Sequence, residues 1–139
     1  MHRRETVEAL EQDAITGRLD QFKKAVARVK AGEWAIEDLA EFLENISALL
    51  ATLAQNYIEL VEETGYNDWA PAEVELATAG MEDYEVGMSQ IWTYIEDGDE
   101  IHLDQGVNTI RTGNNKIIAA MRMNREFRNQ LAEKLEFFL

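Results

Sequence analysis

The chain has 139 residues, with 27 acidic against 13 basic side chains, a net charge of −14, no cysteine and one proline. The missing cysteine excludes disulfides, iron–sulfur clusters, thiolate zinc sites and thiol nucleophiles. The acidic balance opposes binding to nucleic acid and to anionic membrane surfaces, because both ligands are recognised by clustered Lys and Arg.

One hydrophobic core is enough for a chain of this length, so we expect a single helical domain over residues 1–139. No stretch approaches the roughly 20 apolar residues that a membrane span needs. The first residues are charged and precede no apolar segment of the kind that secretory signals carry. We therefore expect a soluble, cytoplasmic protein that does not contact membranes.

Hydrophobic periodicity predicts four helices, over residues 5–31, 35–64, 71–96 and 100–137. The second is the clearest, because apolar residues recur in alternating steps of three and four from Ile36 to Leu60. Gly65 follows it as a left-handed cap, and Pro71 stands where the first position of the third helix is expected.

The fourth predicted helix has one weak point, at Gly113-Asn114-Asn115, where three poor helix formers follow each other. We predict a continuous helix, with a break near Gly113 as the alternative. The reason is a single heptad phase that is kept across the weak point by Ile110, Ile117, Leu131 and Phe138. Four helices joined by short loops predict an all-α, antiparallel up-down-up-down four-helix bundle.

Four glycines are placed regularly in the last two helices. Gly80 and Gly87 lie one heptad apart, as do Gly106 and Gly113, and a turn near residues 96 and 97 brings the two pairs to matching heights. Mid-helix glycine costs about 1 kcal/mol relative to alanine. We therefore expect close packing of the two helix backbones there, with chance placement or a ligand cavity beside the glycines as alternatives.

Charge is segregated along the chain. Residues 31–100 contain 18 acidic residues and no base, while residues 1–30 and 101–139 each have a small basic excess. In the predicted bundle the second and third helices are adjacent, which makes one side of the molecule acidic. Such a side either solvates the protein or steers a basic partner.

His102 is the one histidine in the predicted helical body. The run His102-Leu103-Asp104-Gln105-Gly106 resembles the phosphotransfer motif of histidine-phosphotransfer domains, in which a helical histidine accepts a phosphoryl group and a glycine one turn later admits the partner receiver domain. That resemblance implies His102 as the phosphoacceptor. The leucine and lysine that the family places two and three positions after the histidine are Asp104 and Gln105 here.

No other catalytic or metal-binding pattern is complete. Asp97, Asp99 and Asp104 gather oxygen ligands of the kind that calcium takes, without the spacing of an EF-hand loop. Helix capping by Asp99 explains the same residues. We expect no bound metal, no cofactor and no enzymatic activity.

The remaining candidates are interface residues. An arginine cluster at steps of three suits a carboxylate or phosphate, and aromatic residues at the predicted bundle ends suit an apolar anchor if they are exposed. The candidates are Trp69, Arg122, Arg125, Arg128, Phe137 and Phe138. The leading hypothesis is a non-catalytic protein–protein interaction module that forms a homodimer or serves as an adaptor or chaperone for a basic or amphipathic partner. A phosphotransfer protein using His102 and a small-ligand or cation-binding bundle are the alternatives.

Overall fold

The structure is a computed structural model that describes residues 16–123 and 130–139, without the side chains of Trp69 and Gln130. Every regular element in this part of the chain is a helix, which confirms the predicted all-α class. The helices are α2 (Gly17–Lys30), α3 (Ile36–Thr64), α4 (Tyr66–Trp69), α5 (Pro71–Asp97), α6 (Ile101–Met123) and α7 (Gln130–Phe138). The predicted first helix begins only at Gly17, because Thr16 has an extended backbone and is the N-cap, so the prediction is wrong at that residue. Residues 5–15 of the predicted helix lie outside the described residues.

The two long central helices begin and end within one residue of their predicted limits. Gly65 and Gly98 follow α3 and α5 in the left-handed conformation, with φ of 66° and 75°, where a side chain would be strained. Pro71 is the first residue of α5. The short helix α4 lies in the segment that was expected to be a loop.

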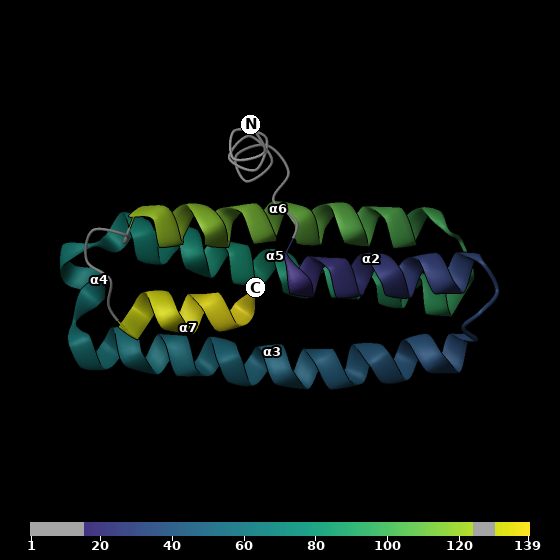
Figure 1. The fold of residues 1–139 in the computed structure, drawn as a ribbon, viewed down its shortest axis with the longest axis horizontal. Coiled ribbons are helices and arrows are strands. Elements are labelled where there is room, and N and C mark those ends of the chain that lie inside the picture. Colours follow the sequence, from purple (N-terminus) through teal and green to yellow (C-terminus); the bar gives the residue numbers. More distant parts are fainter. Residues whose placement is uncertain (1–15, 124–129) are drawn as a thin grey trace, which may run out of the picture.

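The prediction of one helix over residues 100–137 is wrong. Helix α6 passes through Gly113 without a break, so the alternative of a break there is wrong as well, and α6 ends at Met123. Figure 1 shows that α7 is a separate helix, which turns back and lies along α3, end to end with α2. Helix α2 has 14 residues and α3 has 29, so α2 covers only part of the apolar face of α3. Helix α7 packs along α3 because it buries the apolar surface that α2 leaves uncovered.

Helices α7 and α2 meet head to tail near the middle of the molecule (Figure 1). The backbone N–H of Arg18 donates to the carbonyl oxygen of Leu139 at 2.7 Å, and the Arg18 guanidinium donates to the Phe137 carbonyl at 3.3 Å. The first amides of one helix thus satisfy the last carbonyls of another. Together the two short helices form one composite column beside α3.

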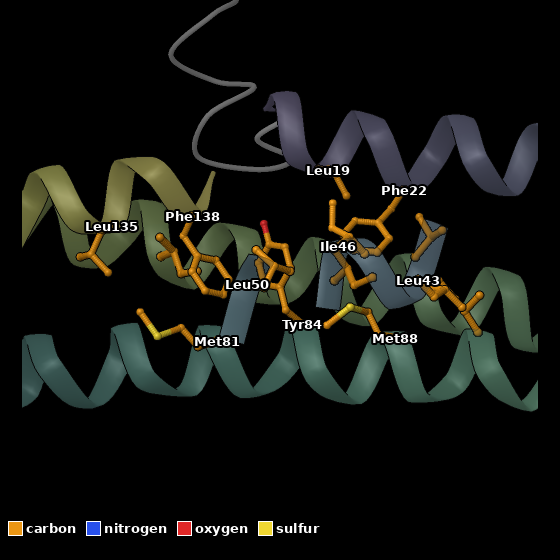
Figure 2. Close-up of a cluster of buried hydrophobic side chains, with 14 of the residues drawn as sticks. Leu19, Phe22, Leu43, Ile46, Leu50, Met81, Tyr84, Met88, Leu135 and Phe138 are labelled. Atoms are coloured by element: carbon orange, nitrogen blue, oxygen red, sulfur yellow. The ribbon is translucent and has the colours of Figure 1, made fainter. Parts of the chain in front are cut away.

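Tyr84 of α5 is the centre of the core at this junction. Its ring packs edge-on against Phe138 of α7, with centroids 4.9 Å apart, and against Phe22 of α2 at 6.3 Å (Figure 2). Its hydroxyl donates to Oδ1 of Asn114 at 2.9 Å, and the Thr16 hydroxyl donates to the same oxygen at 2.8 Å. Asn114 is fully buried, so this pairing stabilises an otherwise unfavourable polar side chain in the core.

The structure brings the four helical glycines together in two pairs. A Cβ built on Gly113 would lie 2.5 Å from the carbonyl oxygen of Gly80, and one built on Gly87 would lie 2.7 Å from that of Gly106. Helices α5 and α6 therefore touch through their backbones, and theirs is the most extensive helix–helix contact in the described structure. Within the described residues, no helix combines the length and the apolarity that crossing a membrane requires.

Candidate functional site

An apolar groove lies between α3 and α5. Its volume is about 460 Å³. The α3 side of the groove is lined mainly by small side chains, and the α5 side by two methionines and two glutamates. The aromatic rings of Tyr84 and Phe138 form its floor. The lining consists of Ser47, Leu50, Ala51, Ala54, Ile58, Thr78, Met81, Glu82, Tyr84, Glu85, Met88 and Phe138.

The groove is open because α3 and α5 approach each other far less closely than α5 and α6 do. Small residues at Ser47, Ala51 and Ala54 recur at helical spacing along one flank of α3, so this flank fills little of the space toward α5. Figure 2 shows Leu50 of α3 and Met81 and Met88 of α5 around Tyr84. The surfaces of α3, α5 and α7 meet at this place.

A second hollow of about 340 Å³ continues the groove toward α4. Ile58 and Thr78 line both, so the two hollows are neighbours. The second hollow is further lined by Tyr57, Val61, Glu62, Gly65, Asn67, Asp68 and Val74. Ile58 is 38 % exposed, which places an aliphatic side chain at the surface where the hollows join.

Acidic side chains border both hollows. Glu82 and Glu85 line the larger hollow, Glu62 and Asp68 line the smaller, and all four are exposed. All 18 acidic residues of 31–100 are exposed except Glu73, which is buried, and Asp83, which is half-buried and pairs with Lys116 of α6 at 2.8 Å. The groove is therefore an apolar strip between two helices that carry no positive charge.

The two aromatic residues near the end of α7 differ in their exposure to solvent. Phe137 is 63 % exposed, as an apolar anchor would be, whereas Phe138 is 2 % exposed in the core. Phe138 therefore does not meet the condition of exposure that was set for an apolar anchor, because its ring packs onto Tyr84.

The other interface candidates are only partly described. Arg122 is half-buried in the last turn of α6. Arg125, Arg128 and the side chain of Trp69 lie outside the described residues, so the predicted arginine cluster stays a prediction.

His102 lies in the first turn of α6 with both ring nitrogens engaged. Nδ1 is 3.1 Å from Oε1 of Gln105, and Nε2 is 2.9 Å from Oδ2 of Asp97. The hydrogen bond with Gln105 and the nearby Asp97 carboxylate raise the pKa of His102. With both ring nitrogens in contact with side-chain oxygens, the phosphoacceptor role implied for His102 stays a prediction.

The three aspartates of the candidate cation site have different partners. Asp97 contacts His102, Asp99 accepts from the N–H of Ile101 at 3.1 Å as a cap of α6, and Asp104 pairs with Lys30. Across residues 16–123 and 130–139, no three His, Asp or Glu side chains are grouped to hold a metal ion.

Glu73 is a buried carboxyl group in the first turn of α5. It is 3 % exposed, and its Oε1 has no hydrogen-bond partner within the described structure. Burial raises the pKa of Glu73, although the hydrogen bond from Tyr66 lowers it. The buried hydroxyl of Tyr57 beside it also lacks a partner among the described residues, and burial raises the pKa of Tyr57.

Replacing Glu73 by Gln should stabilise the protein at neutral pH. Because folding raises the pKa of Glu73, the native chain loses stability as the pH increases from the unfolded to the folded pKa of this carboxyl. The free energy of unfolding of the variant should therefore equal that of the native chain in acid and exceed it at pH 7. We expect a gain of roughly 1 kcal/mol, or about 3–5 °C in Tm, at pH 7. Thermal unfolding at pH 3.5 and pH 7 measures it. Glu75→Gln, at an exposed site two residues away, is the control, and an equal gain there would contradict the assignment.

The groove itself was not identified from the sequence. In the sequence, Met81 and Met88 fit a buried core stripe as well as they fit the lining of a groove. The small residues of α3 lie beside the row of apolar residues that runs from Ile36 to Leu60.

Comparisons with protein-family models, with curated proteins and with solved structures find no match to this chain.

Proposed function

We propose that the protein is a non-catalytic interaction module that binds a basic, amphipathic helix of a partner protein along the groove between α3 and α5. The observation that carries the proposal is an apolar strip between two helices that bear exposed acids and no base. Amphipathic helices bind such grooves through apolar side chains at positions i, i+3 or i+4, and i+7.

The chemistry of the lining supports a helix as the ligand. Met81 and Met88 are unbranched and adapt to different apolar side chains, whereas Tyr84 and Phe138 form a fixed aromatic floor. Small residues on α3 leave room for the backbone of an incoming helix to approach. The partner's Lys and Arg side chains would face Glu82 and Glu85 along the edge, which favours fast and selective association.

The fold that belongs to this proposal is the up-down-up-down bundle, with its fourth column divided between α7 and α2. In that arrangement α3 and α5 are neighbours and their groove faces solvent. The proposal also includes a cytoplasmic location and excludes nucleic acid and lipid as ligands, because the net charge of −14 repels phosphate groups.

Reversal of the groove charges should weaken binding. The probe is a fluorescent 18-residue helical peptide with Leu on one face and Lys on the other, and anisotropy is the measurement. We expect Glu82→Lys with Glu85→Lys to raise Kd at least about tenfold, and half-molar salt to weaken the native complex, because exposed charges are screened.

The matched control reverses two exposed acidic residues outside the groove lining, Glu33→Lys just before α3 and Glu37→Lys in its first turn. This pair changes the net charge equally and should alter Kd by less than about threefold, since only distant, screened charges are involved. Equal weakening by both pairs would reduce the interaction to general electrostatic attraction, and no binding by the native chain would contradict the proposal.

A further inference from the structure

The larger hollow of the groove has an apolar floor. Tyr84 and Phe138 form this floor, and Met81 and Met88 line the hollow on the α5 side (Figure 2). All four side chains are at most 8 % exposed. An apolar side chain that fills this hollow gains free energy by leaving water, whereas a charged one would lose it.

The smaller hollow combines apolar walls with exposed carboxylates. Tyr57 and Val61 of α3 and Val74 of α5 supply apolar surface, and the exposed side chains of Glu62 and Asp68 belong to the same lining. Helices α3, α4 and α5 contain no Lys or Arg that could neutralise these carboxylates. A long basic side chain suits this hollow, because its aliphatic stem packs on apolar residues while its charged head stays at the surface.

The two hollows adjoin each other along the groove. Ile58 of α3 and Thr78 of α5 line both of them, one on each wall. The Thr78 hydroxyl donates to the Val74 carbonyl oxygen within α5 at 2.8 Å, so it needs no acceptor from a ligand at this junction. One helical ligand that lies along the groove therefore covers both hollows.

The spacing of the hollows corresponds to two turns of an α-helix. On α3 the larger hollow spans positions 47–58 and the smaller spans 57–62. On α5 the corresponding spans are 78–88 and 74–78. The centres of the hollows are therefore about seven residues apart on both walls, or about 10.5 Å at a rise of 1.5 Å per residue. Side chains at i and i+7 of a helix have the same separation and project from the same face.

We infer that the partner helix carries two different anchors two turns apart, a large apolar side chain for the larger hollow and an Arg or Lys for the smaller. This inference rests on the function proposed above and specifies the partner of the same groove. The apolar anchor buries its surface on the aromatic floor, and the basic anchor meets Glu62 and Asp68. A helix with another spacing leaves one hollow empty, so the pair of hollows selects among amphipathic helices.

Peptides of one composition test the spacing. Each is an 18-residue helical peptide with Phe at a fixed position and Arg four, five or seven positions later, and in each case the Arg changes places with an alanine. Fluorescence anisotropy measures Kd. We expect the i+7 peptide to bind at least about tenfold more tightly than the others, because i+4 reaches only the junction of the hollows and i+5 lies on another face of the helix. The net charge is the same in all three peptides, so general electrostatic attraction does not produce this difference.

Neutral variants test which carboxylates receive the Arg. In the native chain, replacing the Arg of the i+7 peptide by Met should raise Kd at least about tenfold. In Glu62→Gln with Asp68→Asn the same replacement should change Kd by less than about threefold, because the carboxylates that attract the Arg are gone. Glu82→Gln with Glu85→Gln is the matched control, which removes equal charge from the larger hollow and should keep an Arg effect of about tenfold. All four side chains are exposed, so both variants should fold.

The outcomes separate this inference from the proposed function. Equal binding of the three peptides would show that the hollows are not two anchor sites. Equal loss of the Arg effect in both variants would assign that effect to the overall charge of the groove. Either result overturns the inference and leaves the groove as a helix-binding site, whereas no binding by any of the peptides would contradict the proposed function as well.

Discussion

Gly113→Ala should destabilise the protein by about 2–3 kcal/mol, even though alanine is the better helix former by about 1 kcal/mol. The added Cβ would lie 2.5 Å from the Gly80 carbonyl oxygen and 2.8 Å from Cβ of Asp83. Both atoms belong to the backbone or to its first side-chain carbon, so neither can move without a shift of α5. Chemical denaturation followed by circular dichroism gives the free energy of unfolding.

Gly17→Ala is the control for this prediction, because a Cβ on Gly17 meets nothing within 4 Å. Its stability should be unchanged or slightly higher. The double variant Gly80→Ala with Gly113→Ala should lose less than the sum of the single losses, because the first substitution already separates α5 from α6. A neutral Gly113→Ala would show that the backbones are not in contact.

Phe138→Ala should cost about 3–4 kcal/mol, the usual loss when a buried Phe is truncated to Ala. The ring is 2 % exposed and packs on Tyr84, whose hydroxyl also bonds Asn114. A nine-residue helix is not stable alone in water, so loss of this anchor should release α7 as a unit. Hydrogen exchange should then show earlier loss of amide protection in α7 than in α5 or α6.

Phe137→Ala supplies the matched comparison, with the same truncation one position earlier. Its side chain is 63 % exposed, so the free energy of unfolding should change by less than about 0.5 kcal/mol. Equal losses at the two positions would contradict the placement of α7, since its burial depends on which of the two rings points inward.

The register of α5 against α6 could be predicted from sequence because both helices are long and their turn is short. A turn at Asp97-Gly98-Asp99 fixes which residues lie at equal heights, and the glycine spacing then pairs Gly80 with Gly113 and Gly87 with Gly106. Gly65 predicted the end of α3 and Pro71 predicted the start of α5. These predictions were possible because each residue restricts or permits the conformation of its own backbone, independently of tertiary packing.

The separation of α7 from α6 could not be predicted from local signals. Residues 124–129 contain no helix-breaking residue, and the heptad phase continues across them. What decides the separation is the uncovered part of α3, a tertiary requirement that helical periodicity does not report. Asn114 and Glu73 were missed for a related reason, since a polar residue in a helix gives no sign that it will be buried.

The groove depends partly on features that are visible in the sequence and partly on tertiary packing. Its acidic border follows from the absence of Lys and Arg over residues 31–100, which the sequence states directly. Its apolar floor requires the distance between α3 and α5 and the position of Phe138, and both of these depend on where α7 packs.

The column shared by α7 and α2 has a consequence for synthesis of the chain on the ribosome. Arg18 contacts Phe137 across 119 positions of sequence, so α2 emerges long before the segment that completes its column. Until then the nascent chain presents the apolar stripe of α3 and the ring of Tyr84 to its surroundings, a state that chaperones recognise. Completion of the core therefore waits for translation of residues 130–139, and a ribosome stalled after α6 should hold an unfinished, chaperone-bound bundle.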